Sequence, residues 1–145
     1  MKKVLVVIPA YNEEKNIERV VDNLISNYGQ YDYVVVNDGS TDGTRRVCRK
    51  RGYNLLDLPV NLGLGGAIKS GMKYANYNQY EYVLQFDGDG QHQAQYIEAM
   101  IEKMEETNAD IVIGSRFVEK RKPLTPRMIG SQLITYAIWF TTRGK

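Results

Sequence analysis

Short runs of β-branched and aliphatic residues alternate with segments of helical periodicity along most of this chain, and this alternation constrains its fold most strongly. The run 4–8 ends at Pro9, and apolar residues then recur at helical spacing from Ile17 to Tyr28. Further strands are expected at 33–36, 53–58, 82–86 and 111–113, with helices near 42–51, 65–76 and 97–104. Strands without polar alternation are buried on both faces. The sequence therefore predicts an α/β fold with a doubly wound, mostly parallel sheet and helices on both faces.

The alternation continues to about residue 118, which predicts one domain over 1–118 followed by a basic loop and an amphipathic helix over 119–145. Residues 1–115 hold 12 basic and 16 acidic side chains, whereas 116–145 hold 7 basic and 1 acidic. A basic tail after a mildly acidic body favours contact with phosphates or with an anionic membrane face. A solvated basic loop is the alternative.

Neither a secretion signal nor a membrane span is expected. No apolar run approaches the roughly 20 residues that cross a bilayer, and the first apolar run ends at Pro9 rather than at a small-residue cleavage site. The single Cys48 excludes an internal disulfide and a cysteine-based zinc site within one chain. Because a lone thiol suits a reducing compartment, we expect the cytoplasm.

Polar clusters follow four of the predicted strands, at 11–13, 37–40, 87–89 and 114–116. In open α/β sheets, ligands bind outside the carboxyl ends of the strands. We therefore expect one cleft to collect these four clusters.

Asp87 and Asp89 are the candidate metal ligands. They directly follow a predicted strand and are separated by one glycine, so that two carboxylates can converge on a hard divalent cation, and Gln91 can add a carbonyl oxygen. Mg²⁺ is often held by one or two carboxylates together with substrate phosphates, which predicts a metal that arrives with a diphosphate. The alternative is a polar turn that caps the next helix.

Asp38 and the glycine-rich stretch 61–67 are candidates for nucleotide contacts. The Asp38 carboxylate, at a strand end, can accept a hydrogen bond from a base N–H, while one of residues 40–42 is expected to cap the following helix. Backbone N–H groups around Gly65 can face an anion, although a tight loop before a helix is the alternative. The stretch lacks the Lys-Ser/Thr ending of a P-loop and does not follow the first strand, which disfavours ATPase and NAD-binding functions.

Arg116, at the end of the strand expected at 111–113, is placed to meet diphosphate oxygens through its planar guanidinium, with an ordinary surface arginine as the alternative. His92 is the only histidine, and one histidine cannot build a zinc triad. We expect it beside the metal or at a helix start rather than as a catalytic base.

Residues 128–142 form a predicted amphipathic helix with basic flanks and with Trp139 near its end. This pattern is typical of a helix that lies in a membrane interface. Docking onto another part of the protein, or a homodimer contact, is the alternative.

The sequence resembles family 2 glycosyltransferases of the GT-A fold, most closely the dolichol-phosphate mannosyltransferase and bacterial polyprenyl-phosphate glycosyltransferase group. The motifs that carry the resemblance are IPAYNEE at 8–14, VNDGSTDGT at 36–44, NLGLGGA at 61–67 and FDGDGQH at 86–92. In that group Pro-Pro often follows the Gln-His pair, whereas this chain has Gln93-Ala94. The family also continues beyond a helix like 128–142, so the resemblance implies a truncated chain whose donor half is present and whose acceptor half is largely absent.

The resemblance implies that 1–118 binds a nucleoside diphosphate sugar, with a pocket lined by Pro9, Ala10, Tyr11 and Glu13. It implies that Asp38 contacts the base and that Asp87, Asp89 and Gln91 hold Mg²⁺ or Mn²⁺ on the donor diphosphate, assisted by Arg116. The region 120–142 would meet the lipid phosphate at the membrane, which places the protein peripherally on the cytoplasmic membrane face.

The expected reaction is transfer of a hexose from a nucleoside diphosphate sugar to a polyprenyl phosphate with inversion, by a parent enzyme of which this chain alone is inactive. The acceptor phosphate is already anionic, and Asp89 is the nearest candidate for a general base. Transfer to a polysaccharide or glycan hydroxyl in the cell envelope and a non-catalytic nucleotide-binding module are the alternatives. A sugar nucleotidyltransferase is disfavoured because the first strand leads to no glycine-rich basic loop, and no nucleic-acid partner is expected.

Overall fold

The computed structural model describes residues 3–86 and 96–114 of the 145-residue chain. The elements follow the order β1 (Val4–Ala10), α1 (Ile17–Tyr28), β2 (Asp32–Asp38), α2 (Thr44–Arg51), β3 (Leu55–Leu58), α3 (Gly63–Tyr77), β4 (Tyr82–Gln85) and α4 (Ile97–Thr107). All eight belong to one compact unit, residues 1–110, and residues 111–145 form a second unit.

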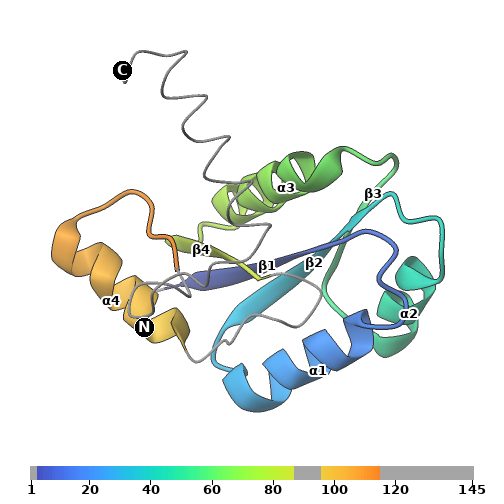
Figure 1. Cartoon of the computed structure of the whole chain (residues 1–145), viewed down its shortest axis with the longest axis horizontal. Coiled ribbons are helices and arrows are strands. Elements are labelled where there is room, and N and C mark those ends of the chain that lie inside the picture. Colours follow the sequence, from blue (N-terminus) through green and yellow to red (C-terminus); the bar gives the residue numbers. More distant parts are fainter. Residues whose placement is uncertain (1–2, 87–95, 115–145) are drawn as a thin grey trace, which may run out of the picture. The chain divides into compact units, whose positions relative to one another are not determined.

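The four strands form one parallel sheet in the order β3-β2-β1-β4. Helices α1 and α2 connect β1 to β2 and β2 to β3, whereas α3 carries the chain back across the sheet to β4, on the other side of β1 (Figure 1). The strand order therefore reverses between β1 and β4. A reversal of this kind is where open α/β sheets bind ligands, at the carboxyl ends of the strands.

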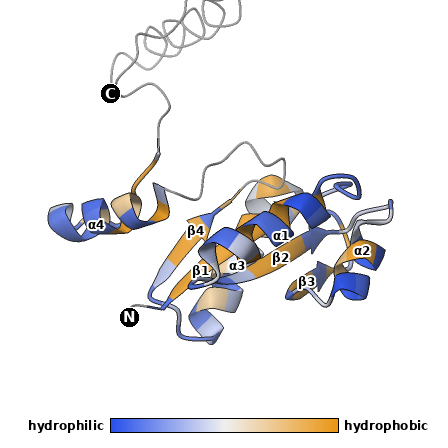
Figure 2. Cartoon of the chain, turned by 90° about the horizontal axis from the view of Figure 1, so that it is seen from below, coloured by the Kyte–Doolittle hydropathy of each residue, from blue (hydrophilic) through white to orange (hydrophobic). Residues whose placement is uncertain are grey.

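Alternate side chains of β1 enter two hydrophobic cores. Val6 and Ile8 pack with α1, α2 and α4, while Leu5 and Val7 pack with α3 on the other face of the sheet. Figure 2 shows the hydrophobic colour concentrated in the strands. Gly71 brings α3 close to β1, because a Cβ at that position would stand 2.4 Å from Cγ1 of Val7. The predicted α/β fold, with a parallel sheet covered on both faces, is confirmed.

Most element positions also agree with the sequence-based expectation, but the strand expected at 111–113 is wrong. Residues 111–114 form no strand, and Ile111 and Ile113 are 77% and 84% exposed. A β-branched run becomes a strand only when a neighbouring strand supplies backbone partners, and in the described parts of the chain no strand pairs with this one. Helices within the described ranges are all too short or too polar to cross a membrane.

Candidate functional site

The candidate site is the edge of the sheet at which the strands end. Ala10 of β1 and Asp38 of β2 reach this edge, and the connections after β1, β2 and β3 all leave from it (Figure 1). The polar clusters predicted after the first two strands are therefore neighbours in space. Side-chain hydrogen bonds join them to each other and to the connection after β3.

Asn12 joins the first connection to the second. Its backbone N–H donates to Oγ of Ser40 at 3.0 Å. Its side-chain Oδ1 accepts from the backbone N–H of Thr41 at 2.9 Å, from the Thr41 hydroxyl at 3.3 Å and from the backbone N–H of Asp42 at 3.4 Å. The backbone of Asn12 is left-handed, with φ of 56°, a conformation that asparagine tolerates better than most residues. One side chain thus holds two loops together.

Two glutamates extend this junction toward α2. The backbone N–H of Glu13 donates to Oγ1 of Thr44 at 2.9 Å, and that of Glu14 donates to Oδ2 of Asp42 at 3.1 Å. In return, Oε2 of Glu14 accepts from the backbone N–H of Gly43 at 3.0 Å. The half-buried Glu13 accepts from Nδ2 of Asn16, at the start of α1. Each of the two loops donates hydrogen bonds to the other and accepts hydrogen bonds from it. The connections after β1 and β2 are therefore fixed relative to each other.

None of residues 40–42 is the N-cap of α2, which is Gly43 without a side-chain cap bond, but Asp42, one residue earlier, still bonds the first residue of the helix. Its Oδ1 accepts from the backbone N–H of Thr44 at 2.9 Å and also from the Thr44 hydroxyl. Burial by itself would raise the pKa of Asp42, but hydrogen bonds from Thr44 and from the backbone N–H of Glu14 lower that pKa below its ordinary value. The ionised carboxylate is therefore the form that holds the two loops together.

Asp38 ties the third connection to the same edge. Its side chain is only 3% exposed, and Oδ1 accepts from the backbone N–H of Leu62 at 2.8 Å. The neighbouring Gly39 has φ of 64°, and a Cβ there would stand 2.5 Å from the backbone nitrogen of Asn61. Only glycine fits this crossing. One oxygen of Asp38 thus has a structural role, and the expected contact with a base would fall to the other.

A second buried polar side chain at this edge, Asn37, was not singled out from the sequence. It is fully buried, and its Nδ2 donates to Oδ1 of Asp57 at 2.7 Å. Asp57 in turn pairs with Arg45 at 2.8 Å and with Arg49 at 3.1 Å. The sequence signal that points to Asn12 and Asn37 is an asparagine at, or just after, the end of an apolar strand, because such a residue can bond the backbone of a neighbouring loop.

The predicted pocket-lining residues Pro9, Ala10 and Tyr11 occupy different environments. Pro9 and Ala10 are paired with β2 inside the sheet, and the Ala10 side chain is buried in the core, so Ala10 presents only backbone to a ligand. The Tyr11 ring is 49% exposed at the edge. Among these three residues, Tyr11 has the side chain that can reach a ligand.

Gly65, in the first turn of α3, has open space around it. No described atom would lie within 4 Å of a Cβ at this position, and its φ is not positive. Neither internal packing nor backbone conformation therefore requires glycine here. A glycine inside a helix costs about 1 kcal/mol relative to alanine, and within the described residues no contact at Gly65 accounts for this cost.

Five of the predicted residues lie outside the described residues: Asp87, Asp89, Gln91, His92 and Arg116. The last described residue before them is Phe86, which is buried and whose backbone N–H donates to the carbonyl of Val7 in the middle of β1 at 2.9 Å. Within 3–86 and 96–114 no three acidic, histidine or cysteine side chains gather as metal ligands. The region 128–142, expected at a membrane or in a homodimer, is likewise outside the described ranges.

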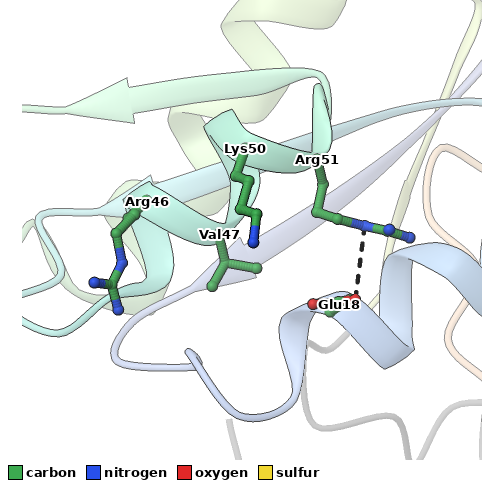
Figure 3. Close-up of a pocket in the computed structure, with 5 residues that line it drawn as sticks. All are labelled: Glu18, Arg46, Val47, Lys50 and Arg51. Atoms are coloured by element: carbon green, nitrogen blue, oxygen red, sulfur yellow. Dashed lines mark ion pairs between the residues drawn. The ribbon is translucent and has the colours of Figure 1, made fainter.

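A hollow of about 380 Å³ lies elsewhere, between α1 and α2. It is lined by Glu18, Arg46, Val47, Lys50 and Arg51, and Figure 3 shows the ion pair between Arg51 and Glu18, 3.7 Å apart. Arg46 also pairs with Glu14 at 2.9 Å. Because acidic partners compensate these two arginines and all five lining residues belong to α1 or α2, we do not assign the candidate site to this hollow.

Comparisons with known proteins identify the family to which the chain is similar. The family model of glycosyl transferase family 2 matches residues 5–144. The chain is 31% identical, over 94% of its length, to the UDP-N-acetylglucosamine--dolichyl-phosphate N-acetylglucosaminyltransferase of Methanococcus voltae. It is 32% identical, over 88% of its length, to the undecaprenyl-phosphate mannosyltransferase of Micrococcus luteus. The chain spans 63% and 55% of the length of these two relatives.

Among solved structures, the chain is similar to a mannosyltransferase from Pyrobaculum calidifontis in complex with GDP-Man and Mn²⁺. The TM-score is 0.54 and the sequence identity 29%, over 60% of this chain and 27% of the other. The similarity therefore concerns about a quarter of that enzyme, and nothing follows from it for the remainder.

Proposed function

We propose, from the premise that this chain belongs to glycosyl transferase family 2, that the carboxyl edge of its sheet binds the donor of a sugar-transfer reaction. The observation that carries the proposal is the joining of three loops at this edge by Asn12, Asp38 and Asp42. A nucleoside diphosphate needs contacts to its base, ribose and phosphates at once. Loops already fixed to one another can supply these contacts with little loss of conformational entropy on binding.

The donor would be a GDP- or UDP-hexose. The named relative from Methanococcus voltae uses a UDP-sugar, and the solved mannosyltransferase holds GDP-Man, so both nucleotides occur among similar proteins. In the proposed site, Tyr11 contacts the nucleotide with its exposed ring, and the second carboxylate oxygen of Asp38 accepts from the base. Gly65 leaves space beside the first turn of α3 for the donor.

Asp87, Asp89 and Gln91 are proposed to hold Mg²⁺ or Mn²⁺, since carboxylate and carbonyl oxygens are the ligands that these ions prefer. When bound, the metal would neutralise charge on the leaving diphosphate. The Arg116 guanidinium would add hydrogen bonds to the same oxygens.

We propose that the whole protein transfers the hexose to a polyprenyl phosphate of the dolichol type, with inversion at the anomeric carbon, while located peripherally at a membrane surface. The support is the pair of relatives named for dolichyl phosphate and undecaprenyl phosphate. A phosphate oxygen of such an acceptor is anionic before it attacks, so the reaction needs little help from a general base. A glycan hydroxyl would need one, and Asp89 is then the candidate.

The test of the donor site is calorimetric titration of UDP and of GDP into the purified chain, with and without Mn²⁺. One nucleotide should bind in a metal-dependent manner, and Asp89→Asn should abolish that dependence. Glu81→Gln is the matched control, because it also replaces a carboxylate by an amide, but at an exposed residue next to the amino end of β4. Absence of binding by a chain that circular dichroism shows to be folded would refute the proposal.

Asp38→Asn sharpens the same experiment. An asparagine keeps an oxygen that can accept from the Leu62 backbone N–H, so the loop stays in place, but it replaces the other oxygen by an amide donor. Weaker nucleotide binding with unchanged stability would support the base contact, and unchanged binding would contradict it. For the acceptor, whole protein given a radiolabelled donor should transfer label to polyprenyl phosphate rather than to a glycan.

A further inference from the structure

Three large aliphatic side chains stand in solvent between the end of β3 and the first turn of α3. Val60 is 59% exposed, Leu62 54% and Leu64 59%, and we call these three residues the apolar tip. Single exposed aliphatic residues are ordinary on protein surfaces, but three within five positions are a cluster. The stretch 58–68 around the tip contains no charged residue.

The backbone of the apolar tip is held by two hydrogen bonds and by close packing against Gly39. Oδ1 of the buried Asp38 accepts from the Leu62 backbone N–H at 2.8 Å. Gly63 has φ of 74°, and its N–H donates to Oδ1 of Asn61 at 2.9 Å. Gly39 packs directly against the backbone of Val60 and Asn61. The contacts therefore fix the backbone from which these exposed side chains project.

The position of the tip limits what can cover it. It lies at the same end of the sheet as the connections after β1 and β2, which form the proposed donor site (Figure 1). If the acceptor is a polyprenyl phosphate, its phosphate lies at the surface of a bilayer, and the edge that holds the donor must come close to that surface during transfer. This step rests on the proposed function.

We propose that the apolar tip inserts shallowly into the bilayer interface when the donor edge approaches its lipid acceptor. An uncharged, aliphatic loop suits this environment, because burying its side chains among acyl chains removes apolar surface from water without placing a charge in hydrocarbon. The next charged residue along the chain is the exposed Lys69, a cation that is compatible with anionic headgroups. The tip thereby adds a membrane contact beside the donor site.

A fluorescent label at the tip tests the insertion. Leu64→Cys in the 145-residue chain would be labelled with an environment-sensitive maleimide, while the fully buried Cys48 remains unreactive in the folded protein. Vesicles of phosphatidylcholine and phosphatidylglycerol should shift the emission to the blue and raise it at least about two-fold, and lipids brominated on the acyl chains should quench it. Val60→Cys gives a second label in case the first variant fails to fold.

Tyr77→Cys is the matched control. Tyr77 is 87% exposed and ends the same helix that begins beside the tip, so a label there should stay in water. No change at the tip, an equal change at position 77, or a change that depends on protein concentration without vesicles would each overturn the proposal. The last two indicate nonspecific adsorption and self-association.

The unlabelled chain would be titrated in parallel with UDP and GDP in the presence of Mn²⁺, because a dye at position 64 would stand next to Gly65 in the proposed donor site. Nucleotide binding without a response of the tip to vesicles would overturn the membrane contact alone. A response of the tip in a chain that binds neither nucleotide would contradict the donor site and leave the membrane contact supported.

Discussion

Substitutions of Asn12 should separate two contributions to the joining of the loops: its side-chain oxygen and its left-handed backbone. The side chain contributes one oxygen that accepts three hydrogen bonds, and the backbone adopts a φ of 56°. Asn12→Gly removes the oxygen but permits the backbone conformation. Asn12→Ala removes the oxygen and also introduces a residue that adopts this conformation poorly. Asn12→Asp keeps an acceptor oxygen.

The hydrogen-bond lengths set the expected size of these effects. Only the bond from the Thr41 N–H, at 2.9 Å, has an ordinary length, since the other two are 3.3 and 3.4 Å and water can replace them at this exposed position. We therefore assign the oxygen about 1 kcal/mol, within the usual net contribution of a hydrogen bond. The left-handed backbone should cost alanine roughly 1 kcal/mol more than glycine. Asn12→Gly should thus lose about 1 kcal/mol of stability and Asn12→Ala about 2 kcal/mol.

Urea denaturation followed by circular dichroism would measure these differences, with the midpoint compared at equal slope. The free energy of unfolding of Asn12→Asp should remain within about 0.5 kcal/mol of the wild-type value. The new carboxylate keeps the hydrogen bonds, and its repulsion from Asp42 cancels only part of their contribution. Asn12→Gly and Asn12→Ala should also weaken nucleotide binding, whereas Asn12→Asp should bind nucleotide about as well as the wild type. Equal stability of the glycine and alanine variants would refute the backbone argument, and no loss in either would refute the role of the oxygen.

Three further predictions concern stability and reactivity. The pKa of Asp42 is lowered in the folded state, so its contribution to the free energy of unfolding is present above its ordinary pKa and is lost as the pH falls through the lowered value. Asp42→Asn should therefore flatten the loss of stability below about pH 4. An acid denaturation profile unchanged by the substitution would contradict this. Burial raises the pKa of Cys48 to about 11, so a disulfide reagent at pH 8 should react only as fast as the protein opens, and immediate reaction would disprove burial of the thiol. Gly71→Ala should cost roughly 1–3 kcal/mol by urea denaturation because its methyl group collides with Val7, and Val7→Ala should relieve that collision.

Local patterns in the sequence were sufficient for the order and kinds of the eight elements from β1 to α4. The helix expected from Ile17 to Tyr28 is α1, and the apolar run 82–86 includes β4. These predictions succeeded because hydrophobic periodicity records which side of an element faces the core. The motifs at the strand ends were also sufficient for the family, which the match over residues 5–144 confirms.

The tertiary structure decided which residues at the strand ends meet. Asn12 bonds to residues 28 to 30 positions away, and Asp38 bonds to Leu62, 24 positions away. It also decided that 111–113 forms no strand, although its composition is typical of one. The physical reason is the same in both cases. A periodic pattern describes the environment of a segment, whereas a hydrogen bond requires a partner that only the folded chain brings within about 3 Å.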